Sequence, residues 1–279
     1  MDKIYVKAPA KINLLLNILS KREDGYHNLE TIFQKISLYD ELYIEKNNTD
    51  SILIDCNIPS LNSEDNLICK AYNALKNLCP SICGVDVKLI KTIPMQAGLG
   101  GGSSDCASFL LAMNTLFNLE LSQKDLVNIG KNLGADVPPF FFGSTLKGEG
   151  IGEIITKLPS NLEYHLIIIK PKISCNTKEM YKIIDENEIV QNYNYEFILK
   201  ALKTSNLQLL CDNLYNVFEE PIKDQVLNIK TELINNGALG ACLTGSGSCI
   251  FGIFESEDSA KSAYNHLKDK YEIYLCTPI

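Results

Sequence analysis

The chain has 279 residues, of which 46% are hydrophobic and 22% charged, and its formal net charge is −8. This length favours two ordinary domains with buried cores over one large domain. The acidic balance argues against a large nucleic-acid surface but leaves room for a local basic pocket that binds a phosphorylated small molecule. No apolar run approaches the roughly 20 residues of a membrane-spanning helix, and "MDKIYVKAPAK" has no signal-peptide character, so we expect a cytoplasmic protein with no nucleic-acid or membrane partner.

Ten cysteines are scattered along the chain, mostly as single small residues in apolar runs, such as Cys106 and Cys249. This pattern predicts reduced core residues and no disulfide framework. Cys79 and Cys83 have the spacing of half a zinc site, but no second pair follows and the three histidines lie far apart. We therefore expect no structural zinc.

The first element is predicted by a period of two, with apolar residues at even positions from Ile4 to Ile18. This indicates a strand with a polar face, or two short strands that meet at Pro9. After the turn-like "REDGYH", the segment "LETIFQKISLYDELYIE" predicts further strand with a break near Asp40. The odd positions of the first strand, which would form its polar face, include Lys7, Lys11, Asn13 and Asn17.

The next segment, "SEDNLICKAYNALKNL", has the apolar spacing of an amphipathic helix, with Ser63 as its expected cap. "VDVKLIKTIP" alternates like a strand and runs into a glycine-rich loop, after which we expect a helix that starts at Ser103 or Ser104. Ser122 with Asp125 resembles a capping box for a further helix that ends near Leu133.

The best candidate for a domain boundary is "LPSNLEY", so we predict an N-terminal domain at 1–160 and a C-terminal domain at 161–279. The second domain opens with the strand "HLIIIKP". Later, "GACLTGSGSCIFGIFE" predicts two strands around a turn, followed by the helix "SEDSAKSAYNHLKDK" and the strand "EIYLCTP". Helices are also expected at 177–187, 195–203, 207–217 and 221–236. Strands and helices in two layers give an α+β fold for both domains.

The stretch "IPMQAGLGGGSSDCA" crowds four glycines and two serines between the predicted strand and helix. Glycines let backbone amides approach a ligand, and a helix start adds unpaired N–H groups, so this geometry suits a phosphate. The stretch matches neither the Walker A pattern, nor a dinucleotide fingerprint, nor a nucleophile elbow. A flexible exposed loop is the alternative, but it would not require a regular element on both sides.

These residues resemble the phosphate loop of the GHMP small-molecule kinases, which has the form Pro-x-x-x-Gly-Leu-x-x-x-Ser-Ser. The chain reads Pro94, Met95, Gln96, Ala97, Gly98, Leu99, Gly100, Gly101, Gly102, Ser103 and Ser104. The resemblance extends to "PAKINL", "DGYH", "EDNL", "LGADVP" and "LTGSGS", in that order along nearly the whole chain.

The resemblance implies a two-domain GHMP kinase-like architecture with an active-site cleft between the domains, and it implies ATP and Mg²⁺ as cofactors. "DGYH" and "LGADVP" match the branch that phosphorylates the 2-hydroxyl of 4-diphosphocytidyl-2-C-methyl-D-erythritol, a cytidine diphosphate-linked substrate, in non-mevalonate isoprenoid synthesis. A mevalonate-type, homoserine or sugar kinase would share the loop. A non-catalytic module that binds ATP is the alternative from another class. No oligomeric state is predicted.

Two catalytic residues are carried over from the family. Asp136, in "GADVPPF", is the candidate base that accepts the proton of the attacking hydroxyl, since a free aspartate is ionised at neutral pH. Lys11 would hold that hydroxyl and favour its deprotonated form; its side chain and that of Asn13 should point the same way from the strand. A turn-forming aspartate and a solvated lysine are the ordinary alternatives.

By the same resemblance, the whole loop from Pro94 to Ser104 wraps the triphosphate, and Asn66 with Leu67 lines the adenosine side. Ser103 or Ser104 would lie near the phosphates, with Mg²⁺ between them, and no protein ligand to the metal is predicted. Asp105 is awkward because a carboxylate in the first turn would repel phosphate. We expect it to face away, or to help hold the metal through water.

The acceptor should require aromatic faces for its pyrimidine base and a few fixed hydrogen bonds. Phe33 could contact the base, but a place in the hydrophobic core would explain this residue equally well. The residues predicted to bind the substrate are Asn13, Tyr26, His27, Thr177, Tyr181 and Gly245. Gly245 belongs to "LTGSGS", which resembles the third GHMP motif and would bring backbone amides beside the phosphate loop; a tight hairpin turn is the alternative.

Overall fold

The computed structural model describes residues 1–159, 161–173, 175–187 and 193–279. The chain forms two compact units. Unit 1 consists of Met1–Ala10, Leu38–Met95 and Gly100–Gly143, and unit 2 of Lys11–Ser37, Gln96–Leu99 and Ser144–Ile279. Both units combine strands with helices, which confirms the predicted α+β class. The division at residue 160 stays a prediction.

Unit 1 is a sheet covered by helices. Its strands follow the order β3-β4-β2-β1, in which β1 (Lys3–Lys21) and β2 (His27–Lys46) each continue into unit 2. Strands β3 (Ile52–Cys56) and β4 (Val85–Ile90) are parallel, whereas β4 and β2 are antiparallel. In β4 every second residue is buried, as its alternating sequence requires.

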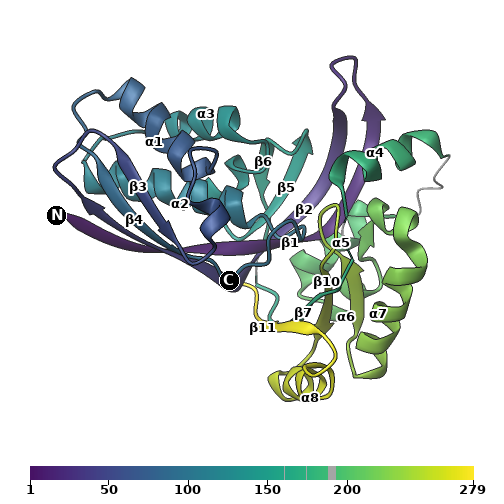
Figure 1. Cartoon of the computed structure of the whole chain (residues 1–279). Coiled ribbons are helices and arrows are strands. Elements are labelled where there is room, and N and C mark those ends of the chain that lie inside the picture. The colour runs from purple at the N-terminus through teal and green to yellow at the C-terminus, as the bar shows by residue number, and fades with distance from the viewer. Residues whose placement is uncertain (160, 174, 188–192) are drawn as a thin grey trace. The chain divides into compact units, whose positions relative to one another are not determined.

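Three helices, α1 (Leu67–Leu78), α2 (Gly101–Leu116) and α3 (Gln123–Leu133), lie on one side of β3 and β4 (Figure 1). Tyr72 and Phe109 are the largest fully buried side chains of this core. The predicted capping box of α3 is present, and this helix ends at Leu133 as expected. Short 3₁₀ helices, η1 (Pro59–Leu61) and η2 (Pro138–Phe141), complete the unit.

Unit 2 contains two groups of strands. In the first, β2 pairs with β5 (Thr145–Gly150), which pairs with β6 (Ile154–Lys157), and β1 pairs in parallel with the short β8 (Tyr215–Asn216). The second is an antiparallel sheet in the order β11-β7-β10-β9. Its strands are β7 (His165–Lys170), β9 (Gly240–Leu243), β10 (Ile250–Phe254) and β11 (Glu272–Cys276).

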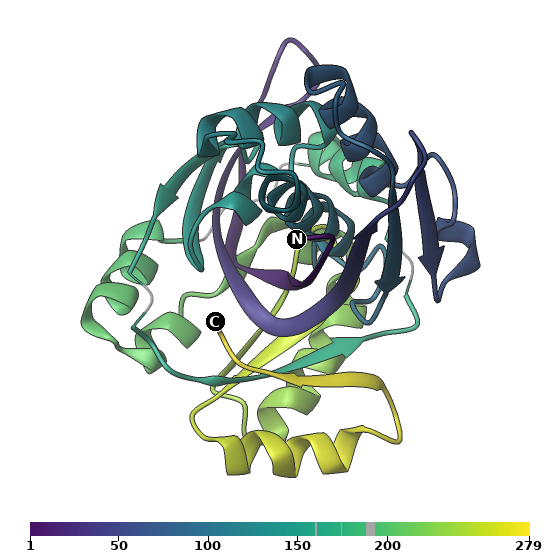
Figure 2. The same ribbon diagram turned by 90° about the vertical axis from the view of Figure 1, so that its left-hand side faces the viewer.

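Helices cover the antiparallel sheet of unit 2. Helix α8 (Glu257–Leu267), in yellow, lies along β7 and β11 (Figure 2), and α7 (Lys223–Asn235) packs against β9 and β10. The remaining helices are α4 (Thr177–Glu186), α5 (Tyr195–Thr204), α6 (Leu207–Cys211) and the 3₁₀ helix η3 (Val217–Ile222). None of the helices in the described part of the chain has both the length and the apolar character needed to cross a membrane.

Strand β1 is continuous through Pro9, which is one of the two predicted alternatives. Several other predicted boundaries were wrong. Strand β2 is continuous through Asp40 because this carboxylate is fully buried with partners of its own. Helix α1 is capped by Asn66, three residues after the expected cap Ser63. The helix expected at 207–217 ends at Cys211, after which the chain enters β8.

Candidate active site

The glycine-rich loop connects β4 to α2. Three of its residues have positive φ: Gln96 (52°), Gly98 (78°) and Gly100 (69°). Gly100 is the N-cap, so α2 begins at Gly101, earlier than the predicted Ser103 or Ser104. The first helical hydrogen bond runs from Ser104 N to Gly100 O (2.9 Å). The backbone N–H groups of Gly101, Gly102 and Ser103 precede this bond in the chain. They lie at the positive end of the helix dipole.

Gly98 and Gly245 explain why two distant motifs need glycine. A Cβ atom on Gly98 would lie 1.9 Å from the carbonyl oxygen of Thr244, and one on Gly245 would lie 2.7 Å from the Cα of Gly98. Both positions also have positive φ. The turn between β9 and β10 therefore packs main chain against main chain on the loop, and Cys249 N donates to Ala97 O (3.1 Å).

Lys11, on β1, is anchored on the loop. Its side chain is 6% exposed, and its Nζ donates to Gly98 O (2.9 Å) and to Asn13 Oδ1 (2.6 Å). Its backbone N donates to Leu99 O (3.0 Å). The side chains of Lys11 and Asn13 thus point the same way. This part of the polar face of β1 is buried and not solvated.

Asn13 joins Lys11 to the turn that contains Gly245. Its Oδ1 accepts from Gly245 N (2.9 Å), and its Nδ2 donates to the hydroxyl of Thr31 (2.8 Å). Asn216 Nδ2 donates to the carbonyl oxygen of Gly245 (2.9 Å) from the other side. Thr31 and Asn216 were not predicted from the sequence, because a buried polar network has no local periodicity to reveal it.

Asp136 lies in the turn between α3 and η2. The turn is closed by a bond from Val137 N to Gly134 O (3.1 Å), and the two prolines that follow are buried. The Asp136 side chain is exposed, whereas Val137 next to it is fully buried. The sequence therefore fixes this carboxylate on the surface of unit 1, where a ligand can reach it.

The first residues of α2 differ in burial. Ser103 is half-buried, whereas Ser104 is fully buried, and its hydroxyl has no hydrogen-bond partner among the described residues. Ser103 is thus the serine that a ligand could contact. Asp105 is the fifth residue of α2, past its first turn, and is 3% exposed. Burial raises the pKa of Asp105 to about 7, although the neighbouring Lys91 opposes this shift.

Two of the residues predicted to bind the base contact each other in unit 2. The His27 ring stacks on Tyr181, with centroids 4.7 Å apart, and the Tyr181 ring meets Phe218 edge-on. His27 Nε2 lies 2.7 Å from the carboxylate of Asp185, a residue that the sequence analysis did not identify. A hydrogen bond from Lys21 lowers the pKa of Asp185, and His27 adds to this shift although slight burial opposes it. Tyr26 is 59% exposed.

The remaining predicted residues have different surroundings. The Thr177 hydroxyl, at the start of α4, lies 2.8 Å from that of Ser246 in the Gly245 turn. Asn66 Oδ1 accepts from Ile68 N (3.0 Å), and Asn66 Nδ2 donates to Leu61 O (3.0 Å), so this side chain caps α1. Phe33 is 5% exposed, as in a core residue. The described residues contain no group of three or more His, Cys, Asp or Glu side chains that could hold a metal ion.

Known proteins resemble this chain along most of its length. The model of the GHMP kinases N terminal domain matches residues 66–144, and that of the GHMP kinases C terminal matches residues 198–273. A relative from Acetivibrio thermocellus, named 4-diphosphocytidyl-2-C-methyl-D-erythritol kinase, is 42% identical over 284 residues, with 100% of both chains covered.

Solved structures show the same similarity. A crystal structure of 4-(cytidine 5'-diphospho)-2C-methyl-D-erythritol kinase is 30% identical, with a TM-score of 0.85 and 98% of each chain covered. A homoserine kinase from Cytophaga hutchinsonii, 18% identical, has a TM-score of 0.76 over 100% of this chain and 95% of its own, which shows similarity of fold alone. The chain belongs to the GHMP kinase family.

Proposed function

We propose that the protein transfers the γ-phosphoryl group of ATP to the 2-hydroxyl of 4-diphosphocytidyl-2-C-methyl-D-erythritol, a step of non-mevalonate isoprenoid synthesis. The relatives named for this substrate cover the whole chain, which favours it over mevalonate, homoserine or a sugar. The observation that carries the proposal is the bond from Lys11 Nζ to Gly98 O (2.9 Å), because it holds a cation against the glycine-rich loop.

The proposed mechanism depends on positioning and on charge. The loop from Pro94 to Ser104 binds the phosphates with its amides. Asp136 accepts the proton of the acceptor hydroxyl while the new O–P bond forms and the bond to the leaving ADP breaks. Lys11 stabilises the negative charge that develops on the acceptor oxygen. Asn13 fixes the Lys11 ammonium through its 2.6 Å bond.

Mg²⁺ fits this chain as an ion carried by the nucleotide. The described residues offer no multi-carboxylate cage, and Mg²⁺ commonly keeps its waters and binds phosphate oxygens with one or two protein oxygen atoms. Ser103, half-buried on the first turn of α2, is the hydroxyl we propose for such a contact. The bound ion would neutralise charge on the phosphates.

For the acceptor, we propose that the exposed ring of Tyr26 stacks on the cytosine base, with His27, Thr177 and Tyr181 lining the same region. The pairing of His27 with Asp185 supports this, because it fixes the orientation of the imidazole. Asn66 remains our candidate for the adenosine side.

We also propose domains at 1–160 and 161–279 and a cytoplasmic location. The two family matches, at 66–144 and 198–273, fall one in each proposed domain.

The catalytic roles are tested by Asp136→Asn, which removes the base and keeps the shape. We expect kcat to fall by about 10² or more with nucleotide affinity unchanged. Asp125→Asn is the matched control, because Asp125 is also an exposed carboxylate and lies on the adjacent α3; its kcat should equal that of the wild type. Tight ATP binding by the wild type without any phosphorylated product would support the non-catalytic module instead. Normal turnover by Asp136→Asn would rule out Asp136 as the base.

The choice of acceptor is tested by single-turnover phosphorylation of the cytidine-linked substrate, mevalonate and homoserine. We expect the cytidine-linked substrate to be preferred. A preference for either of the others would assign the chain to another branch of the family.

A further inference from the structure

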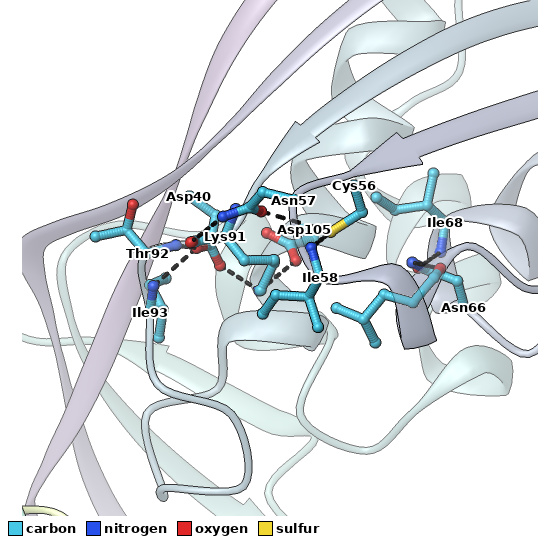
Figure 3. A network of polar contacts seen from close by, with 11 residues as sticks. Asp40, Cys56, Asn57, Ile58, Asn66, Ile68, Lys91, Thr92, Ile93 and Asp105 are labelled. Carbon is cyan, nitrogen blue, oxygen red and sulfur yellow. Dashed lines mark hydrogen bonds and ion pairs between the residues drawn. The ribbon is translucent and has the colours of Figure 1, made fainter.

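A buried ionic cluster lies beside the start of α2. Lys91, directly after β4, places its ammonium between the carboxylates of Asp40 and Asp105, and the Lys91–Asp105 bond is 2.6 Å long (Figure 3). All three side chains are nearly inaccessible, at 4% exposure or less. Burial alone would lower the pKa of Lys91, but the two carboxylates outweigh burial and raise it. Lys91 is therefore the charged centre of this cluster.

The cluster holds the residues that enter the glycine-rich loop. Asp40 Oδ1 accepts from the backbone N of Thr92 (2.6 Å) and of Ile93 (2.8 Å), immediately before Pro94. The main chain of Lys91 is held in turn by Asn57, whose amide exchanges two hydrogen bonds with it (2.7 and 3.0 Å; Figure 3).

The same cluster holds the residues that leave the loop. Asp105 ties α2 directly to Lys91, and Gly101, the first residue of α2, packs on the ionic groups. A Cβ atom on Gly101 would lie 3.2 Å from Lys91 Nζ and 3.3 Å from Asp40 Oδ2. One ammonium thus fixes the main chain on both sides of the loop.

Stability alone is a weak explanation of this arrangement. The Coulomb energy of a buried ion pair often offsets only part of the free energy lost by removing its charges from water. Apolar residues of similar volume therefore often stabilise a core equally well. The cluster also holds two carboxylates for one ammonium, and the second oxygen of Asp105 has no hydrogen-bond partner among the described residues. Directional bonds to the main chain are what an apolar core could not supply.

We infer that Lys91, Asp40 and Asp105 are positioning residues that set the two ends of the phosphate loop for nucleotide binding. They act through the main chain of the loop and do not contact the reacting atoms. This inference rests on the proposed role of the loop as the nucleotide site.

The test is Asp105→Ala, which cuts the bond between α2 and Lys91. Lys91 keeps Asp40 as its counter-ion, so no unpaired charge is left buried and the variant should fold. We expect the Kd for ADP to rise about tenfold or more, the order expected when a hydrogen bond to a charged group is lost, while the Kd for CDP, a probe of the acceptor side, stays unchanged. Asp105→Asn keeps an acceptor oxygen for Lys91 and should restore ADP binding to within about twofold.

Leu116→Ala is the matched control. Leu116 is a buried residue at the far end of the same helix, about 16 Å along its axis from Asp105. This variant should lower the Tm and leave the Kd for ADP unchanged. If Asp105→Ala does not fold, Asp105→Leu fills the space without the bond and carries the same expectation.

The outcomes separate the two proposals. Absence of ADP binding by the wild type would refute the nucleotide role of the loop. If the wild type binds ADP and the folded Asp105→Ala or Asp105→Leu variant binds it equally well, the positioning role is wrong. Equal weakening of ADP binding by Leu116→Ala would reduce the effect to stability and overturn the inference as well.

Discussion

At the scale of single residues, we expect alanine substitutions at two glycines of the loop to have opposite effects on stability. Gly98 has positive φ, and a Cβ there would strike Thr244 at 1.9 Å, so Gly98→Ala should lower the free energy of unfolding by more than about 1 kcal/mol. Gly102 has neither constraint, since no atom outside its chain neighbours and the backbone of its own helix lies within 4 Å of its Cβ position. Gly102→Ala on α2 should therefore keep or raise stability, by up to about 1 kcal/mol.

The second measurement on these variants is nucleotide affinity. If Gly102 is glycine so that a phosphate can approach the main chain, Gly102→Ala weakens ADP binding in a fully stable protein. Thermal unfolding and calorimetric titration on both variants would check this pair. Undiminished ADP binding by Gly102→Ala would mean that the ligand does not approach at this residue.

Residues within one motif could be predicted from the sequence, and residues that meet across the fold could not. The loop glycines and the parallel orientation of Lys11 and Asn13 follow from local spacing. Asp40, in contrast, suggested a break in a strand, because its partner Lys91 lies 51 residues further on. A carboxylate in an apolar pattern is ambiguous until its counter-ion is located.

At the scale of elements, the N-terminus of α1 separates two roles of Asn66. Asn66→Ala removes the cap and should lower stability by about 1 kcal/mol, which a denaturant titration would measure. Asn66→Ser restores a capping oxygen and most of the stability. If Asn66 also contacts the nucleotide, the KM for ATP should be raised in Asn66→Ala and remain raised in Asn66→Ser. A normal KM in Asn66→Ser would mean that this residue acts only as the helix cap.

Elements with strong local signals were confirmed, namely the capping box of α3, the alternation of β4 and the hairpin of β9 and β10. The short strands β3, β5 and β6 were missed; β3 and β5 pair with strands distant in the sequence, β4 and β2. The fold class was confirmed. The burial of both faces of β1 was not foreseen, because it depends on layers that assemble far from it in sequence.

At the scale of the whole molecule, the ten free cysteines predict how the native protein reacts with a thiol reagent. Seven are buried, and burial raises the pKa of Cys106, Cys249 and Cys276 to about 12. Only thiolates react readily, so these remain inert near pH 8. A reagent such as dithionitrobenzoate should modify at most the three partly exposed cysteines, Cys79, Cys83 and Cys175, before unfolding and all ten afterwards. Fast modification of more than three would contradict the observed packing.

The contact between Gly98 and Gly245 has a consequence for inhibitor design. A compound that hydrogen-bonds only to the main chain of the loop would contact no side chain there that a mutation could remove. Exchange of either glycine would drive a Cβ into the other strand of main chain, to 1.9 Å or 2.7 Å. Drug resistance through these two positions would thus disable the target itself.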